Sequence, residues 1–247
     1  MTLANIKKGK RGKMRERLII LGEKKIGKTT FGAAAPKPIF IPTEDGCSSI
    51  NGLDYFPKQT TYQGILDCII SLGKDKHDFE TVVFDTLDGI VDILSEEVTT
   101  KEFSGSPHKF NNYLQGNKVV TAKLKGFVDM LDRLREEKGM RIILLCHPGT
   151  ANMKNPEGED YVKTTGAMGK FTWGLFTNWA DRIGYAGYDF IIRNADDAGK
   201  KGKAKQLGSE RHLRFGGTAS LDVGCRVGYE LKEDKMMFDY KAYKENQ

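Results

Sequence analysis

The stretch from Arg17 to Ala35, RLIILGEKKIGKTTFGAAA, constrains the fold more than any other part of the chain. The four apolar residues that follow Arg17 predict a strand buried on both faces, as in a parallel sheet. Gly22 to Thr29 then matches the pattern G-x-x-x-x-G-K-[ST] in full. Thr30 to Ala35 favours a short helix, which Pro36 ends. Strand, glycine-rich loop and helix, in this order, form the structural context of a phosphate-binding loop.

The loop predicts a site for a nucleoside triphosphate. Backbone N–H groups of such a loop and of the following helix N-terminus converge on one point and favour an anion there. Lys28 is expected to reach the β- and γ-phosphates, and the Thr29 hydroxyl to coordinate Mg²⁺. The alternative is a chance Gly-Lys-Thr on a surface turn, against which the flanking strand and helix argue. The predicted nucleotide-binding residues are Gly22, Glu23, Lys24, Lys25, Ile26, Gly27, Lys28, Thr29 and Thr30.

Composition narrows the class of protein further. A chain of 247 residues with 39% hydrophobic and 29% charged residues is typical of one soluble globular domain. Apolar runs are all far shorter than the roughly 20 residues of a membrane span, so no membrane partner is expected. The N-terminus lacks the apolar segment of a secretory signal, and four scattered cysteines favour a reducing, cytoplasmic compartment. The net charge of +6 favours an anionic partner.

Residues 1–16 are predicted to form a flexible basic arm, and residues 17–247 a single nucleotide-binding domain. Seven Lys or Arg lie between Lys7 and Arg17, against one acid, Glu16. Such a run of like charge with little apolar surface does not pack into a core. Two interpretations are open: contact with nucleic-acid phosphates without base specificity, or a solvated tail.

Acidic residues follow two further apolar strands. Pro38 to Pro42 is followed by Glu44 and Asp45, and Phe79 to Phe84 by Asp85. In open α/β sheets, ligands bind at the carboxyl ends of the strands. Glu44, and less so Asp45, is therefore expected to polarise the water that attacks the γ-phosphate, the alternative being a polar turn. Asp85 fits the Walker B carboxylate, which holds Mg²⁺ beside Thr29.

Two more residues belong to this predicted edge. Asp88 is expected to cap a helix from Gly89 to Glu97. Arg141 to Cys146 forms another apolar strand, and His147 at its end is expected to sense the γ-phosphate by hydrogen bonding. The alternative for His147 is a structural role, which is common for a single histidine at a strand end.

Helical periodicity is clear in two other stretches, Tyr62 to Leu72 and Asn117 to Lys138. Ser104 to Gly116 is predicted as a polar loop and Pro148 to Lys170 as a long structureless one. The second loop contains Lys163 and Lys170 and precedes Phe171 and Trp173, a combination that suits single-stranded DNA. A lid over the nucleotide, or a hairpin whose aromatic residues pack in the core, are the alternatives.

The C-terminal third predicts mainly antiparallel strands. Ala180 to Ala186 and Asp189 to Arg193 are expected to pair, Arg211 to Phe215 forms a strand, and Arg226 to Tyr229 pairs with Met236 to Tyr240 in a terminal hairpin. Between them, Gly199 to Lys205 is expected to be an exposed loop, either tracking DNA phosphates or only solubilising the protein. Its candidate DNA contacts are Lys200, Lys201, Lys203 and Lys205.

Together these motifs resemble the RecA-like ATPases of phage genomes. The resemblance is carried by GEKKIGKTTF (Gly22 to Phe31), PKPIFIPTEDG (Pro36 to Gly46), TVVFDTLDGI (Thr81 to Ile90) and RIILLCH (Arg141 to His147). Within that family the chain looks most like small single-domain phage proteins that act in single-strand annealing and recombination. The resemblance covers roughly the first 150 residues well, and it places the protein in the bacterial host cytoplasm.

The resemblance implies roles for individual residues. Glu44 corresponds to the catalytic glutamate, Asp85 to the magnesium carboxylate, and His147 to a sensor position that is often Gln in RecA-like proteins. Arg211 or Arg214 corresponds to residues that act on the site of a neighbouring subunit in rings or filaments. Lys24 and Lys25 depart from the small residues that many relatives have in the phosphate loop.

The sequence thus predicts an α/β RecA-like P-loop fold with a mainly parallel sheet, flanking helices and an antiparallel C-terminal extension. The expected activity is Mg²⁺-dependent ATP hydrolysis coupled to single-stranded DNA binding, with Lys28, Glu44, Asp85 and His147 as catalytic residues. A homo-oligomer and a single-strand-binding protein are the expected partners. Two alternatives are open: a nucleotide-gated switch or loader for a replication partner, and a small-molecule or nucleotide kinase.

Overall fold

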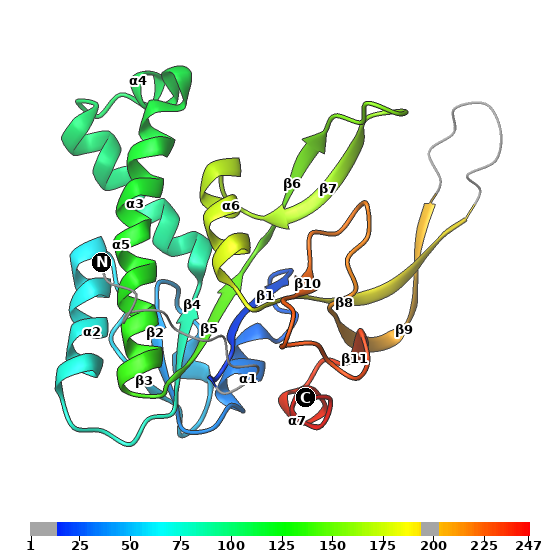
Figure 1. Cartoon of the computed structure of the whole chain (residues 1–247), viewed down its shortest axis with the longest axis horizontal. Helices are drawn as coiled ribbons and strands as arrows, with labels where there is room; N and C mark the ends of the chain where they lie inside the picture. Colours follow the sequence, from blue (N-terminus) through cyan, green and yellow to red (C-terminus); the bar gives the residue numbers. More distant parts are fainter. Residues whose placement is uncertain (1–13, 194–202) are drawn as a thin grey trace, which may run out of the picture.

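The computed structural model describes residues 14–193 and 203–247. Its centre is a sheet in which six neighbouring strands are parallel, in the order β3-β2-β4-β5-β1-β8 (Figure 1). These strands are β1 (Arg17–Gly22), β2 (Pro38–Pro42), β3 (Asp54–Tyr55), β4 (Thr81–Asp85), β5 (Arg141–Cys146) and β8 (Arg182–Arg193). The predicted mixed α/β fold with a mainly parallel sheet is confirmed at this level.

An antiparallel extension continues the sheet beyond β8. Strand β9 pairs with β8 along almost its whole length, and β11 pairs with β9 at the outer edge. Strand β10 also pairs with β8, at the beginning of that strand. The three strands are β9 (Lys203–Arg214), β10 (Gly224–Cys225) and β11 (Lys235–Met237).

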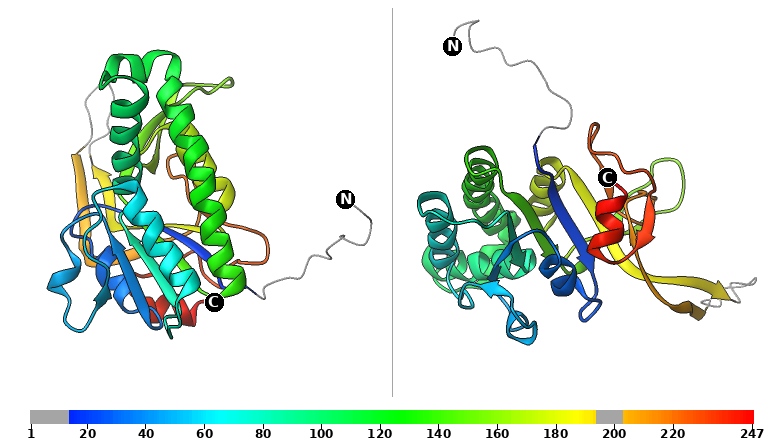
Figure 2. Two further views of the ribbon diagram at one scale, coloured as in Figure 1. Left: turned by 90° about the vertical axis from the view of Figure 1, so that its left-hand side faces the viewer. Right: turned by 90° about the horizontal axis from the view of Figure 1, so that it is seen from below.

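Helices cover both faces of the sheet because successive residues of its strands point to opposite sides. In β1, Ile19 and Leu21 pack with one group of helices, and Leu18 and Ile20 with the other. The first face carries α2 (Tyr62–Lys74), α3 (Leu87–Glu102), α5 (Gln115–Glu137) and α6 (Lys170–Trp179). The second carries α1 (Lys28–Ala33) and α7 (Tyr240–Glu245), as the two views in Figure 2 show. Strands β1, β2, β4 and β5 are buried on both faces, and for this reason they read as continuous apolar runs.

Two segments that were predicted as loops are ordered. Residues 104–116 contain α4 (Pro107–Asn111) and the 3-10 turn η3 (Asn112–Leu114); a second such turn, η2 (Cys47–Ser49), follows β2. The stretch from Pro148 to Lys170 is not structureless: β6 (Pro148–Met153) and β7 (Tyr161–Gly166) form a hairpin that projects from the sheet (Figure 1). Helix α6 follows at once. A hairpin was one of the alternatives that the sequence left open, and the largely polar character of its strands is why the pattern favoured a loop.

The C-terminal strand predictions were wrong in two respects. Residues 182–193 form one strand, β8, which pairs with β9 and not with itself. The expected terminal hairpin does not form, because Lys235–Met237 pairs with β9 and residues 240–245 are helical. The helix buries Tyr240 and Tyr243 at a spacing of three residues, against Phe31 of α1.

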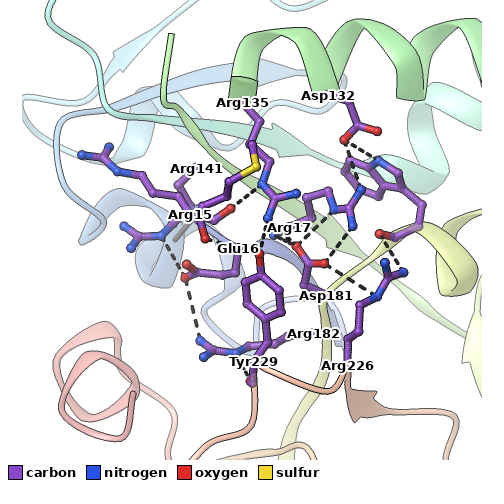
Figure 3. A network of polar contacts seen from close by, with 12 residues as sticks. Arg15, Glu16, Arg17, Asp132, Arg135, Arg141, Asp181, Arg182, Arg226 and Tyr229 are labelled. Atoms are coloured by element: carbon purple, nitrogen blue, oxygen red, sulfur yellow. Dashed lines mark hydrogen bonds and ion pairs between the residues drawn. The ribbon is translucent and has the colours of Figure 1, made fainter. Parts of the chain in front are cut away.

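A polar network lies at the amino ends of β1 and β8, opposite the edge at which these strands end (Figure 3). The Glu16 carboxylate accepts hydrogen bonds from Arg141 Nε at 2.8 Å and from the Tyr243 hydroxyl at 3.0 Å. Asp181 binds Arg17 at 2.8 Å in the same network. These contacts connect the amino end of β1 to β5, to α7 and to the start of β8.

The network corrects the boundary of the predicted basic arm. Glu16 is only 5% exposed, and Arg15 binds the Glu80 carboxylate at 2.7 Å, so both residues belong to the folded domain. Residues 1–13 of the predicted arm lie outside the described residues. Across the part of the chain that the structure describes, no helix combines the length and apolar character needed to cross a membrane.

Candidate functional site

The loop between β1 and α1 has the backbone geometry that its glycines predict. A Cβ on Gly22 would lie 3.0 Å from Ile26 Cγ2 and 3.2 Å from Ala186 of β8, so the loop passes too close to β8 for a larger residue. Gly27 has φ +106°, a conformation that costs a residue with a side chain 1–3 kcal/mol as an order of magnitude. The loop then enters α1, whose first turn presents free N–H groups.

Lys28 lies folded back over this loop. Its ammonium donates to the backbone oxygens of Gly22 at 2.6 Å and Glu23 at 3.0 Å, and the residue is 6% exposed. Burial lowers the pKa of Lys28, although the nearby Asp85 and Asp88 carboxylates oppose the shift. The hydrogen bonds of this buried ammonium go to carbonyl oxygens, so an incoming anion would stabilise its charged form.

Thr29 and Asp85 meet beside Lys28, as the sequence predicted. The Thr29 hydroxyl donates to Asp85 Oδ2 at 2.7 Å, although 56 residues separate the two positions. Burial raises the pKa of Asp85, and the hydrogen bond from Thr29 and the charge of Lys28 oppose the rise. A hydroxyl and a carboxylate are hard oxygen ligands, so this pair fits Mg²⁺.

The carboxyl ends of β2, β4 and β5 adjoin the loop and complete a cavity of about 430 Å³. Thr43 joins two of these ends, because its N–H donates to Asp85 O and its hydroxyl accepts from Thr86 N. This volume falls within the range of small-molecule sites. Its lining residues are Lys24, Lys25, Gly27, Lys28, Thr29, Thr30, Glu44, Asp45, Gly46, Ser49, Ile50, Asp85, Thr86 and His147. Of the predicted loop residues, Gly22, Glu23 and Ile26 do not line it.

Glu44 lies at the open side of the cavity with about half of its side chain exposed. Its carboxylate is 3.9 Å from His147 Nδ1, at the end of β5. Asp45 also lines the cavity, but its carboxylate binds Lys58 at 2.6 Å and its side chain is 81% exposed. Of the two acids after β2, Glu44 is therefore better placed to hold a water beside a bound phosphate.

Asp88 was predicted as a helix cap and has a different function. Thr86 caps α3 by accepting from Gly89 N, whereas Asp88 accepts from both His147 N at 2.9 Å and His147 Nδ1 at 2.7 Å. A carboxylate can only accept, so His147 Nδ1 carries the proton in this contact. Asp88 therefore fixes the orientation of the histidine ring. The only hint of this contact in the sequence is that Asp88 follows Asp85 by three residues, close to the predicted sheet edge.

The two arginines proposed to act on a neighbouring subunit have partners within this chain. Arg211 Nη1 donates to the backbone oxygen of Ile26, in the phosphate loop, at 2.7 Å. Arg214 binds the Asp189 carboxylate and donates to Tyr188 O at 3.1 Å. Of the two, only Arg211 contacts the phosphate loop.

The predicted DNA contacts fall into three groups. Lys170 begins α6 and Lys205 lies on β9, and both are exposed. Lys163 is already paired with Asp222 at 2.8 Å. Lys200 and Lys201 lie outside the described residues, as does the side chain of Lys203.

The aromatic residues beside the hairpin differ in exposure. Phe171 is 46% exposed and is available for stacking. Trp173 is only 5% exposed, and its Nε1 donates to Asp222 at 2.7 Å. The core-packing alternative is therefore correct for Trp173, which anchors the base of the hairpin instead of presenting a ring to solvent.

The comparison with protein families agrees with this geometry. The model of the AAA domain family matches residues 14–226, which include the phosphate loop, the carboxyl ends of β1, β2, β4 and β5, and the β8–β9 pair. A comparison with curated proteins returned no match. The match extends over most of the chain, and the residues that it spans build a P-loop site. The protein therefore belongs to the AAA domain family of P-loop ATPases.

Proposed function

We propose that the protein is a RecA-like ATPase that hydrolyses Mg²⁺-bound ATP and couples this reaction to the binding of single-stranded DNA. The observation that carries the proposal is the convergence of Lys28, Thr29 and Asp85. Thr29 donates a hydrogen bond of 2.7 Å to Asp85, and Lys28 is buried beside them. All three residues line the same cavity at the carboxyl edge of the sheet. Catalysis of phosphoryl transfer consists largely of such positioning and charge stabilisation.

Each residue has a part in the proposed reaction. Lys28 leaves the carbonyls of Gly22 and Glu23 and binds the β- and γ-phosphates. Thr29 and Asp85 hold Mg²⁺, which when bound neutralises the charge that develops on the phosphate oxygens. Glu44 accepts a hydrogen bond from the attacking water and orients it towards the γ-phosphorus.

In this proposal, His147 senses by hydrogen bonding whether the γ-phosphate is present. Asp88 holds Nδ1, and within the described residues Nε2 has no hydrogen-bond partner. His147 also connects directly to the β6–β7 hairpin, because Ala167 N donates to His147 O at 2.9 Å. A change at the γ-phosphate is thereby passed to the hairpin that follows β5.

The DNA part of the proposal rests on the surfaces beyond this hairpin. Lys170 and Phe171 stand exposed at the start of α6, and Lys205 is exposed on β9. Exposed cations and an aromatic ring bind single-stranded DNA through phosphate contacts and base stacking. Assembly into rings or filaments, a single-strand-binding protein as partner, and a role in phage recombination are proposed on the sequence resemblance alone.

The direct test is ATP turnover by the full chain with and without a single-stranded oligonucleotide of mixed sequence, at low salt. We expect Mg²⁺-dependent turnover that the oligonucleotide accelerates. Turnover that is unaffected by DNA, together with no DNA binding, would contradict the coupling but leave the ATPase. Phosphate transfer to a nucleoside monophosphate in the same assay would identify a kinase, and ATP binding without turnover a switch.

A further inference from the structure

We propose that Arg211 positions the phosphate loop of its own chain, so that the Gly27 amide points at the bound phosphates. The inference rests on the proposed nucleotide site and adds a residue to it. Arg211 lies on β9, 184 residues after Gly27, and it contacts the loop without lining the cavity. The juxtaposition comes from the fold and was not visible in the sequence.

Arg211 holds one peptide unit of the phosphate loop, the one between Ile26 and Gly27. Arg211 Nη1 donates to Ile26 O at 2.7 Å. The Ile26–Gly27 bond is trans, so its C=O and N–H groups point in opposite directions. Because Arg211 holds the carbonyl, the Gly27 N–H points away from Arg211, and Gly27, unlike Arg211, lines the cavity. Among the described residues, that N–H has no hydrogen-bond partner.

The Arg211 guanidinium also lies directly against Gly27. A Cβ at position 27 would lie 2.7 Å from Arg211 Nη1, so the guanidinium occupies the space that a side chain would need. The glycine of the motif thus serves two purposes here: it permits φ +106° and leaves room for the arginine. A charged donor also makes a stronger hydrogen bond to a carbonyl than a neutral one.

Arg211 is itself held in place through its main chain. Its backbone oxygen accepts from Phe238 N at 2.8 Å, and in the β8–β9 register it lies opposite Tyr188. The Phe238 ring stacks on Phe31 of α1, with 5.2 Å between ring centroids. The main chain that carries Arg211 is therefore fixed to the same helix that the phosphate loop enters.

This geometry predicts a specific kinetic pattern. The Gly27 amide contacts a phosphate before and during the reaction, so its loss weakens ground state and transition state alike. Arg211→Ala is expected to raise the KM and the dissociation constant for ATP about tenfold or more, with little change in kcat. Arg211→Lys keeps one donor and should recover part of the affinity.

The test measures ATP binding and steady-state turnover for Arg211→Ala, Arg211→Lys and Lys28→Ala in the full chain. Arg133→Ala, an exposed arginine on the other face of the sheet, is the matched control, and thermal melting verifies that each variant folds. For Arg211→Ala, a fall in kcat at unchanged ATP affinity would overturn the proposal. A wild-type kcat together with a wild-type ATP affinity would overturn it as well. If Lys28→Ala also binds ATP normally, the proposed nucleotide site itself is wrong.

A mixing experiment separates action within the chain from action on a neighbour. Lys28→Ala protein keeps Arg211, and Arg211→Ala protein keeps its own phosphate loop. If Arg211 serves its own loop, a mixture of the two retains only the activity of the separate variants. Recovery of wild-type ATP affinity in the mixture would overturn the proposal, because it would show that Arg211 reaches a neighbouring subunit.

Discussion

At the scale of single residues, the site divides into groups that bind and groups that orient. Lys28, Thr29 and Asp85 lie close together and largely buried, as binding groups for a charged ligand should be. Glu44 is half exposed at the mouth of the cavity, where water has access. Asp88 does not line the cavity, and its hydrogen bonds go to the backbone N–H and the ring Nδ1 of His147. These differences lead to separate predictions for Glu44 and for Asp88.

Glu44→Gln is expected to retain ATP binding and to lose turnover by about 100-fold or more, because the amide cannot take up a proton from the attacking water. Isotopically labelled ATP in single-turnover assays measures the loss, and equilibrium binding measures what is kept. The matched control is Asp45→Asn, which changes the neighbouring carboxylate bound to Lys58 and should leave turnover close to wild type. Equal losses in both variants would contradict the role given to Glu44.

Asp88→Asn is expected to lower kcat about tenfold while ATP affinity stays near wild type. Asparagine can offer Nδ1 a donor where aspartate only accepts, so the histidine changes tautomer. Because Asp88 acts through His147, the double variant with His147→Ala should be no slower than His147→Ala alone. Additive losses in that cycle would show that Asp88 has a role independent of the histidine.

At the scale of elements, β1 runs from the polar network at one edge of the sheet to the phosphate loop at the other. Its carboxyl end leads into the phosphate loop, and its amino end is held by the network around Glu16 and Asp181. Burial alone would raise the pKa of Glu16, but Arg141 and Arg182 overcome this effect and lower it. The stability of this element should therefore depend on pH.

Stability is expected to fall in acid as Glu16 becomes protonated. The folded-state pKa lies below the unfolded value near 4.5, so the contribution is complete above that pH and is lost as the pH falls through the folded value. Denaturant unfolding between pH 3 and 7 measures the loss. Glu16→Gln should cost about 3 kcal/mol at pH 7 and flatten this part of the profile. An equally steep acid profile in the variant would assign the dependence to other groups.

The exposed start of α6, next to the β6–β7 hairpin, is expected to contribute to DNA binding. Lys170→Ala should weaken single-stranded DNA binding and reduce the slope of log K against log salt by about 0.7, the value for one phosphate contact. Lys76→Ala is the control, since Lys76 is exposed before β4 at the opposite edge of the sheet. The same loss in both variants would indicate only a general effect of net charge.

The elements also show which features a sequence can reveal. Strands β1, β2, β4 and β5 were predicted because burial on both faces makes them continuous apolar runs. Helix α6 was missed although Trp173, Phe176 and Trp179 recur every three residues, because a long polar stretch precedes it. Strand β11 was paired wrongly, since three residues carry no information about which distant strand they join.

The sequence likewise predicted only part of the candidate site. The motif and the strand ends placed Lys28, Thr29, Glu44, Asp85 and His147 at one edge, because the carboxyl ends of parallel strands must meet there. The contact of Asp88 with His147 and that of Arg211 with Ile26 depend on side-chain directions and on the course of β9. No local pattern encodes these two contacts.

At the scale of the whole molecule, the nucleotide site and the C-terminal extension form one structural unit. The family match ends at residue 226, yet residues 235–245 beyond it pack on α1 and support Arg211. The β8–β9 pair begins beside β1 and extends away from the body of the protein (Figure 1). A nucleotide bound at the loop therefore lies against the base of the segment that is proposed to contact DNA.

The most direct measurement is the equilibrium binding of ATP to the wild type and to Lys28→Ala, each with Mg²⁺ and with EDTA, with Lys76→Ala as control. The account predicts Mg²⁺-dependent binding by the wild type and the control, and a loss of about 100-fold or more in Lys28→Ala, because a buried cation no longer meets the phosphates. ATP affinity that is unchanged in Lys28→Ala, or equal with and without Mg²⁺ in the wild type, would contradict the convergence of Lys28, Thr29 and Asp85 on one nucleotide.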